Sequence, residues 1–161
     1  MQKVLSADTH DWPAASAFPL EFVQLDDGVD LGRLALAAAP PGAGPATLAD
    51  WIDRMLLLLG SGEGTLLDGC SFVARSRTGL LGASLVVLRD GEPWLAQLLV
   101  APAYRRQGLG TALLAASLTA LGRARYPALH ARPGADDDIA FLTGRRFAER
   151  AANPLGADAL E

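Results

Sequence analysis

Two glycines one residue apart follow a pair of arginines near the middle of the chain. Residues 105–111 read Arg-Arg-Gln-Gly-Leu-Gly-Thr, between an apolar run that ends in Pro102 and a run rich in Ala and Leu. Gly108 and Gly110 carry no Cβ, so a ligand can approach the backbone closely. A helix that begins here would direct its free N–H groups and the positive end of its dipole at the same loop. The pattern predicts a phosphate-binding site, and the two arginines add positive charge.

Other phosphate-binding loops fit these residues less well. A Walker loop needs a Gly-Lys pair, and the chain contains none. The dinucleotide-binding fingerprint needs a third glycine where Leu113 stands, followed by an acidic residue about twenty positions further on. The glycine-rich segment 60–64 has no lysine or helix start behind it, so we interpret it as a connector. One alternative for residues 105–111 stays open, a simple connector whose arginines are solvated.

The loop resembles the signature of the GNAT superfamily of acyl-CoA-dependent N-acyltransferases. That signature is Arg or Gln, two residues, Gly, one residue, Gly or Ala, and Arg105, Gly108 and Gly110 match it. The resemblance extends from about residue 71 to residue 147. It implies that the loop amides hold the coenzyme A pyrophosphate and that the preceding strand binds the pantetheine arm. The residues predicted to bind the coenzyme are therefore Leu98, Leu99, Val100, Arg105, Arg106, Gln107, Gly108, Leu109, Gly110 and Thr111.

The usual proton-transfer residues of this family are absent from their usual places. Counting back from Phe147, Leu142 stands where the family usually has a Tyr that protonates the leaving thiolate. Ala96 stands where the family often has a Glu, and Gln97 beside it cannot act as a base at neutral pH. His130 has a suitable pKa range, although a strand histidine is more often structural. The catalytic residues are therefore unassigned.

Acyl transfer can survive these losses. The acceptor must be held as a free amine close to the carbonyl carbon, and its proton can leave through water. The developing oxyanion needs a hydrogen-bond donor, for which we expect a strand N–H near Leu98 or Leu99.

The elements that position the loop can be predicted from periodicity and capping residues. Trp51, Met55, Leu58 and Leu59 form an apolar stripe on a helix that Thr47 caps, and Asp30 is expected to cap an earlier helix. The predicted strands are 20–25, 71–75, 81–88, 94–100, 127–131 and 147–151, and the predicted helices are 31–39, the one after Thr47, 108–123 and 136–145. This order predicts one α/β (α+β) domain over residues 1–161, a mixed, mostly antiparallel sheet flanked by helices. The resemblance adds a β-bulged strand and a Gly-rich pyrophosphate loop.

The two ends of the chain are less regular. Residues 1–19 contain two prolines and are expected to form an irregular arm with at most a short strand. Only 14 residues follow Phe147, fewer than the family's final hairpin commonly needs. Either the sheet is one strand smaller, or the N-terminal arm takes that place, or a second subunit does. An unpaired edge would favour a homodimer.

Composition excludes several classes of protein. The net charge of −4 argues against nucleic acid as a partner. Two histidines are too few for a histidine-based metal site, so we predict no metal. The single cysteine, Cys70, lies in an apolar run and is expected to be a buried thiol. The apolar segment 55–59 is far shorter than a membrane span, and no signal peptide is visible, so we expect a cytoplasmic protein without membrane contact.

These observations predict an acetyl-CoA-dependent N-acetyltransferase. Acetyl-CoA would be the co-substrate, and the acceptor would be an amine of a small molecule or of a protein. The alternative is a degenerate GNAT fold that binds acyl-CoA as a regulatory or interaction module. The missing Tyr and Glu, and a missing Asn whose position in the family falls on Ala135, favour that alternative.

Overall fold

In the computed structural model, the described residues are 4–9, 18–40, 42, 44–132 and 148–150, and the structural statements below concern them. These residues form three helices longer than one turn and eight strands. The helices are α1 (Gly28–Ala38), α2 (Leu48–Leu59) and α3 (Leu109–Arg123). The strands are β1 (Val4–Asp8), β2 (Glu21–Phe22), β3 (Thr65–Leu66), β4 (Phe72–Ser76), β5 (Gly79–Arg89), β6 (Glu92–Val100), β7 (Ala128–Ala131) and β8 (Ala148–Arg150).

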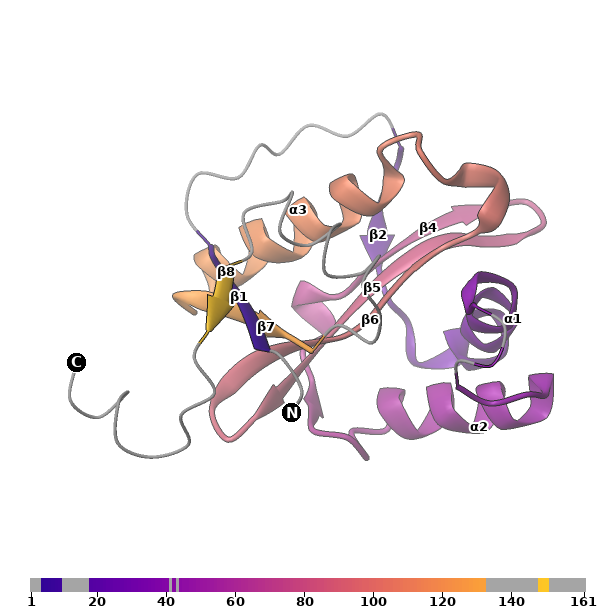
Figure 1. The fold of residues 1–161 in the computed structure, drawn as a ribbon, viewed down its shortest axis with the longest axis horizontal. Coiled ribbons are helices and arrows are strands. Elements are labelled where there is room, and N and C mark those ends of the chain that lie inside the picture. The colour runs from indigo at the N-terminus through magenta and orange to yellow at the C-terminus, as the bar shows by residue number, and fades with distance from the viewer. Residues whose placement is uncertain (1–3, 10–17, 41, 43, 133–147, 151–161) are drawn as a thin grey trace.

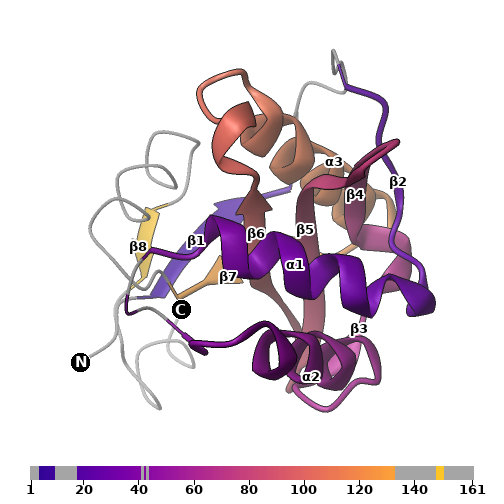
Figure 2. The ribbon, with the colours of Figure 1, turned by 90° about the vertical axis from the view of Figure 1, so that its right-hand side faces the viewer.

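The strands form one sheet between two helical layers. Their order is β2-β4-β5-β6-β7-β1-β8, and β3 pairs with β5. Among the described strands only β6 and β7 pair in parallel. Helices α1 and α2 cover one face of the sheet and α3 covers the other (Figures 1 and 2). The predicted mixed, mostly antiparallel sheet flanked by helices is therefore confirmed.

Strand β1 occupies the position beside β7. It pairs with β7 from Leu5↔Ala131 to Asp8↔Ala128 and with β8 on its other side. Its continuation approaches α3 closely, because a Cβ on Gly122 would lie 2.9 Å from the Thr9 carbonyl oxygen. The sequence left open a smaller sheet, a strand from the N-terminal arm, or a strand from a second subunit. In the described residues, the N-terminal segment supplies the strand.

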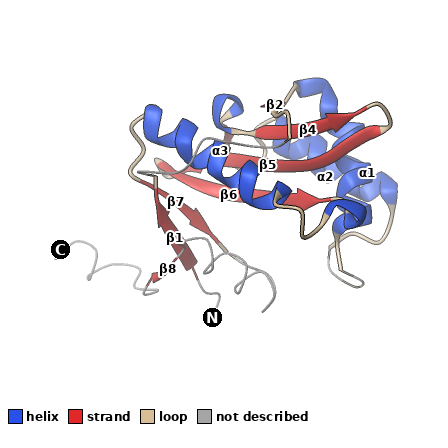
Figure 3. Ribbon diagram, turned by 90° about the horizontal axis from the view of Figure 1, so that it is seen from above, coloured by secondary structure: helices blue, strands red, loops and turns tan. Residues whose placement is uncertain are grey.

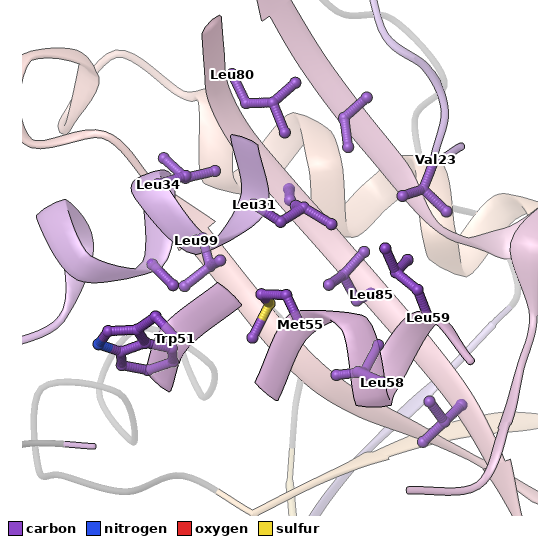
Figure 4. Close-up of a cluster of buried hydrophobic side chains, with 14 residues drawn as sticks. Val23, Leu31, Leu34, Trp51, Met55, Leu58, Leu59, Leu80, Leu85 and Leu99 are labelled. Atoms are coloured by element: carbon purple, nitrogen blue, oxygen red, sulfur yellow. The ribbon is translucent and has the colours of Figure 1, made fainter. Parts of the chain in front are cut away.

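The α1/α2 face carries a large apolar cluster, shown in Figure 4. Helix α2 contributes the predicted stripe, since Trp51, Met55, Leu58 and Leu59 are all buried. Thr47 caps this helix as predicted, accepting a hydrogen bond from the Asp50 amide at 3.2 Å. A second cluster on the opposite face packs α3 against β1, β5 and β7, and its fully buried members include Leu114, Leu118, Leu121 and Leu129.

The region before α2 differs from the prediction. The expected strand 20–25 is only two residues long, and α1 begins at Gly28, three residues before the predicted start. The cause is Asp27, whose buried carboxylate accepts hydrogen bonds from the Gln24 amide at 2.8 Å and from Arg75 Nη2 at 2.9 Å. These bonds turn the chain into the helix at Asp27, so Asp30 is not the cap.

The last predicted elements lie mostly outside the described residues. The predicted helix 136–145, with Leu142, belongs to that part of the chain. The predicted strand 147–151 corresponds to β8.

Candidate functional site

The glycine loop connects β6 to α3 through a short helical turn, Pro102–Tyr104. Gly108 precedes the helix in a left-handed conformation with φ 84°. The first helical hydrogen bond runs from the Ala112 amide to the Gly108 carbonyl at 2.9 Å. The amides of Leu109 and Gly110 come before that bond, so they have no acceptor within the helix. The predicted strand, turn and helix N-terminus are thus in place as an arrangement of free donors.

The backbone just before the helix adds to this arrangement. Arg106 has a positive φ of 63°, as Gly108 does, and Gln107 stands between them. Left-handed residues that alternate with right-handed ones turn successive amides toward a common point, which is how anion-binding nests form. A Cβ built on Gly108 would meet no atom within 4 Å. The space beside the Gly108 Cα is therefore open, and free backbone amides of this kind are suitable donors for a pyrophosphate-like anion.

Two side chains of the loop are used to hold it in place. Arg105 Nη2 donates to the carbonyl oxygen of Ala38, the last residue of α1, at 2.6 Å. Positive charge is favourable at this end of a helix. Gln107 Nε2 donates to the Ala103 carbonyl at 3.1 Å. Arg106 is exposed. A role of these residues in binding a coenzyme stays a prediction.

A β-bulge interrupts β6 just before the loop. Leu85 pairs with Gln97 and Val86 pairs with Leu95, so Ala96 is an extra residue on β6. This confirms the bulged strand that the resemblance implied. The parallel pairing of β6 with β7 involves only Trp94 and Leu95. Beyond the bulge, β6 has no strand partner on that side within the described residues, and Figure 3 shows β7, β1 and β8 diverging from it.

The register identifies the backbone groups that face this open edge. The Ala101 amide donates to the Leu81 carbonyl at 2.8 Å, which continues the β5–β6 register. Since bonding alternates along an antiparallel ladder, Leu99 also turns its backbone groups toward β5. Leu98 and Val100 turn theirs away, toward the open edge. Of the two expected oxyanion donors, the register thus favours Leu98 over Leu99.

The two faces of β6 lead to different surroundings. The side chains of Leu98 and Val100 pack on the α3 side with Tyr104. Leu99 belongs to the cluster under α1 and α2, together with Trp51. A ligand bound along the open edge of β6 would therefore lie between the glycine loop on one side and the α1/α2 layer on the other.

The residues considered for proton transfer do not gather at this edge. Ala96 is the bulge residue itself, and Gln97 beside it is half-buried. His130 is buried opposite Trp94, with Nδ1 2.6 Å from Ser6 Oγ and Nε2 3.5 Å from a Glu92 carboxylate oxygen. Trp94, which pairs with His130, precedes Leu98 by four residues, which is about 13 Å along a strand. These contacts favour a structural role for His130.

Two other groups can be placed. Cys70 is buried, as expected, and burial raises the pKa of its thiol above the ordinary 9.0, with a smaller contribution from the Asp68 carboxylate. The thiol is therefore neutral at physiological pH. The described part of the chain contains no group of three or more His, Cys, Asp or Glu side chains that could hold a metal ion. Within the same residues, no helix has both the length and the apolar character to cross a membrane.

Comparison with known proteins gives a consistent result. A family model described as an acetyltransferase (GNAT) domain matches residues 68–149. No curated protein sequence matches the chain. Among solved structures, a GCN5-related N-acetyltransferase from Sphaerobacter thermophilus is similar with a TM-score of 0.65 and 15% identity, over 92% of this chain and 49% of that one.

Two further structures are similar over most of their own length. The ribosomal-protein-S18-alanine N-acetyltransferase from Escherichia coli has a TM-score of 0.62 and 20% identity, over 83% of this chain and 79% of that one. The PaiA N-acetyltransferase from Thermoplasma acidophilum, solved in complex with coenzyme A, has a TM-score of 0.61 and 13% identity, over 80% and 87%. The chain spans about half the length of the Sphaerobacter protein. The TM-scores of all three structures show a shared fold, at low sequence identity.

Proposed function

Because the chain belongs to the acetyltransferase (GNAT) domain family, we propose that it transfers an acetyl group from acetyl-CoA to an amine of a small molecule or of a protein. The observation that supports this most is the continuity of two donor sets. The free amides at the start of α3 follow the open edge of β6 in the chain, and only residues 101–108, which include the turn Pro102–Tyr104, stand between them. A ligand with an anionic group and an amide-containing arm would match both sets.

Each donor set has a distinct task in this proposal. The amides around Gly108 would hold the pyrophosphate, and the backbone groups of Leu98 and Val100 would bond the amide groups of the pantetheine arm. Acetyl-CoA supplies a thioester, an activated acyl group. The Leu98 amide is our choice for the donor that stabilises negative charge on the acyl oxygen as the new bond forms.

The chemistry then needs little from side chains. The amine nitrogen bonds to the acyl carbon, the carbon–sulfur bond breaks, and the sulfur leaves with the electron pair. The amine loses one proton and the thiolate gains one, both through water, since Ala96 and Gln97 offer no base at the bulge. Rate would come mainly from positioning and from the backbone donor.

A second candidate is a binding module that holds acyl-CoA without transferring the acyl group. The observation in its favour is Ala96, which puts a methyl group at the bulge where the family often has a Glu. Both candidates require coenzyme binding, so binding alone does not separate them.

The test has two stages. Calorimetric titration is expected to show binding of acetyl-CoA but not of free acetate, which is the control. Thermal melts are expected to show a raised melting temperature with acetyl-CoA only. Absence of binding at millimolar acetyl-CoA would refute both candidates. Release of free thiol is then followed across a panel of amines. Turnover above the rate of water-driven hydrolysis supports the transferase, whereas binding without turnover supports the module.

A further inference from the structure

A pocket lies between α1 and the turn that joins β4 to β5. Its volume is about 150 Å³, and all the residues that line it belong to the described part of the chain. A cavity of this size can hold a molecule of about six heavy atoms. Part of its lining is apolar, because Leu34 of α1, Leu80 of β5 and Ala101 after β6 contribute to it. Figure 4 shows Leu34 and Leu80 at the same end of the apolar cluster.

The pocket also holds one acidic and one basic side chain that the protein does not fully engage. Asp30 and Arg33 both line it, and Arg33 Nη1 lies 3.7 Å from Asp30 Oδ1. This separation makes an ion pair but is too long for a hydrogen bond. Within the described part of the chain, neither group has another hydrogen bond or ion pair. The side chains are 39% and 65% exposed, so a ligand can reach both from solvent.

The wall opposite α1 leaves space for a ligand. Gly79 lines the pocket with φ +138°, and a Cβ there would meet no atom within 4 Å. Thr78 beside it is exposed, and its Oγ1 lies 3.2 Å from Ser76 Oγ. A hydroxyl group can donate one hydrogen bond and accept others, so the Thr78 hydroxyl can also bond a polar occupant.

The pocket adjoins the glycine loop without overlapping the predicted coenzyme edge. The Ala101 amide bonds the Leu81 carbonyl, so the pocket lies on the β5 side of β6, whereas the open edge of β6 lies on the β7 side. Ala37 of the pocket precedes Ala38, whose carbonyl accepts the hydrogen bond from Arg105. An occupant would therefore rest against the end of α1 that bonds the glycine loop.

We propose that this pocket binds a small α-amino acid, with its carboxylate on Arg33 and its ammonium group on Asp30. Because the two protein charges are only 3.7 Å apart, the two charges of the ligand must also lie close together. This condition is met when both groups are attached to one carbon atom. The apolar part of the lining suits a short aliphatic side chain, and alanine has about the number of heavy atoms that the volume allows. The inference goes beyond the proposed transfer reaction and does not depend on it.

NMR titration of the backbone amides at pH 7 tests the class of ligand. Alanine is expected to bind with a Kd of about 1–10 mM, because so small a ligand at a partly exposed ion pair gains little free energy. The largest shifts should fall on residues 30–37 and 78–80. Ethylamine lacks the carboxylate, propionate lacks the ammonium group, and 6-aminohexanoate holds the two charges far apart. Each should bind at least about fivefold more weakly than alanine. Equal binding of any of the three, or shifts confined to other residues, would overturn the inference.

Neutral substitutions assign each charged group. Arg33→Gln should raise the Kd for alanine about fivefold or more and leave the Kd for ethylamine unchanged. Asp30→Asn should raise the Kd for alanine similarly and leave the Kd for propionate unchanged. Arg54→Gln and Asp53→Asn are the matched controls, because they remove the same charges from exposed positions on α2. If the controls weaken alanine binding as much, the effect is one of net charge alone and the inference fails.

Two further measurements test the pocket itself. Ala37→Phe adds a ring at the exposed rim without changing a charge, so it should abolish the shifts caused by alanine while circular dichroism shows an unchanged helix content. Alanine binding that persists in the folded Ala37→Phe variant would refute the assignment. Saturating acetyl-CoA should not displace alanine, and displacement would overturn a site separate from the coenzyme. The alanine titrations need no acetyl-CoA, so failure of the transferase proposal leaves their outcome intact.

Discussion

Alanine at Gly108, compared with alanine at Gly91, separates a role in ligand binding from a role in the backbone alone. Both glycines have a left-handed backbone, with φ 84° and 79°, and a Cβ at either would meet no atom within 4 Å. Gly91 lies in the turn between β5 and β6, behind Asp90, which also has a positive φ. The two substitutions thus impose the same kind of strain at places that differ in their relation to the predicted coenzyme site.

The expected magnitudes follow from this geometry. A left-handed alanine costs roughly 1–2 kcal/mol, so both variants should lose that much folding free energy and melt about 2–8 °C lower. Only the Gly108 methyl group would stand in the space where an anion approaches the α3 amides. Loss of one hydrogen bond to a charged group costs about 1.5–3 kcal/mol. The Kd for acetyl-CoA should therefore rise roughly 10- to 150-fold in Gly108→Ala and stay within about twofold in Gly91→Ala.

Calorimetric titration with acetyl-CoA measures both dissociation constants, and thermal melts without ligand check that the strain is matched. Gly108→Asn serves as a second variant, because asparagine tolerates the left-handed conformation better than alanine while still carrying a Cβ. If all three variants fold and bind acetyl-CoA as tightly as the unchanged chain, the loop is a connector and the reasoning about its open space is wrong.

Three further predictions concern the register of β6, a buried carboxylate and the buried thiol. Leu98→Pro removes an amide that faces the open edge, so this variant should fold but lose thiol release. Leu99→Pro removes a ladder bond to β5, so this variant should be unfolded as measured by circular dichroism. Asp27→Ala removes a buried carboxylate and leaves Arg75 with the exposed Glu21 as its carboxylate partner, so it should lower the free energy of unfolding by about 2–3 kcal/mol in urea titration. The control Asp30→Ala, at a partly exposed side chain, should have no measurable effect. Because the pKa of the Cys70 thiol is raised in the folded chain, the folded thiol keeps its proton at a pH where the unfolded thiol releases it. The free energy of unfolding should therefore fall as pH rises above about 9, by at most about 1.4 kcal/mol per pH unit. Cys70→Ala should remove that dependence.

Local signals were sufficient where neighbouring residues determine the structure. The cap at Thr47 and the apolar stripe of α2 follow from spacing within one helix, and both are confirmed. The start of α3 follows from a glycine whose left-handed conformation interrupts the chain just before a run of Ala and Leu. In these segments each residue acts on others within one or two turns, so periodicity alone carries the information.

Contacts between distant residues determined what the sequence did not reveal. The start of α1 depends on Arg75, 48 positions after Asp27, whose guanidinium stabilises a buried carboxylate. The place of β1 depends on pairing with β7, more than 120 residues later in the chain. Arg105 was expected to add charge beside an anion, but its side chain also bonds an α1 carbonyl 67 positions earlier in the chain. Trp51 was predicted as a core residue, and only the three-dimensional surroundings show that its N–H lacks an acceptor.

The bulge in β6 shows why binding and proton transfer can separate in such a chain. Opposite the bulge, the Val86 amide donates to Ser71 Oγ at 2.9 Å, and the same hydroxyl donates to the Leu67 carbonyl at 2.9 Å. Ser71 is fully buried and takes the place of a strand partner where β4 has not yet begun. The β5 backbone opposite the bulge is thus bonded to residues remote from Ala96, and the direction of the Leu98 amide follows from its register with β5. The open edge of β6 is therefore present without a carboxylate at position 96, so thiol release rather than binding must decide between the two proposed functions.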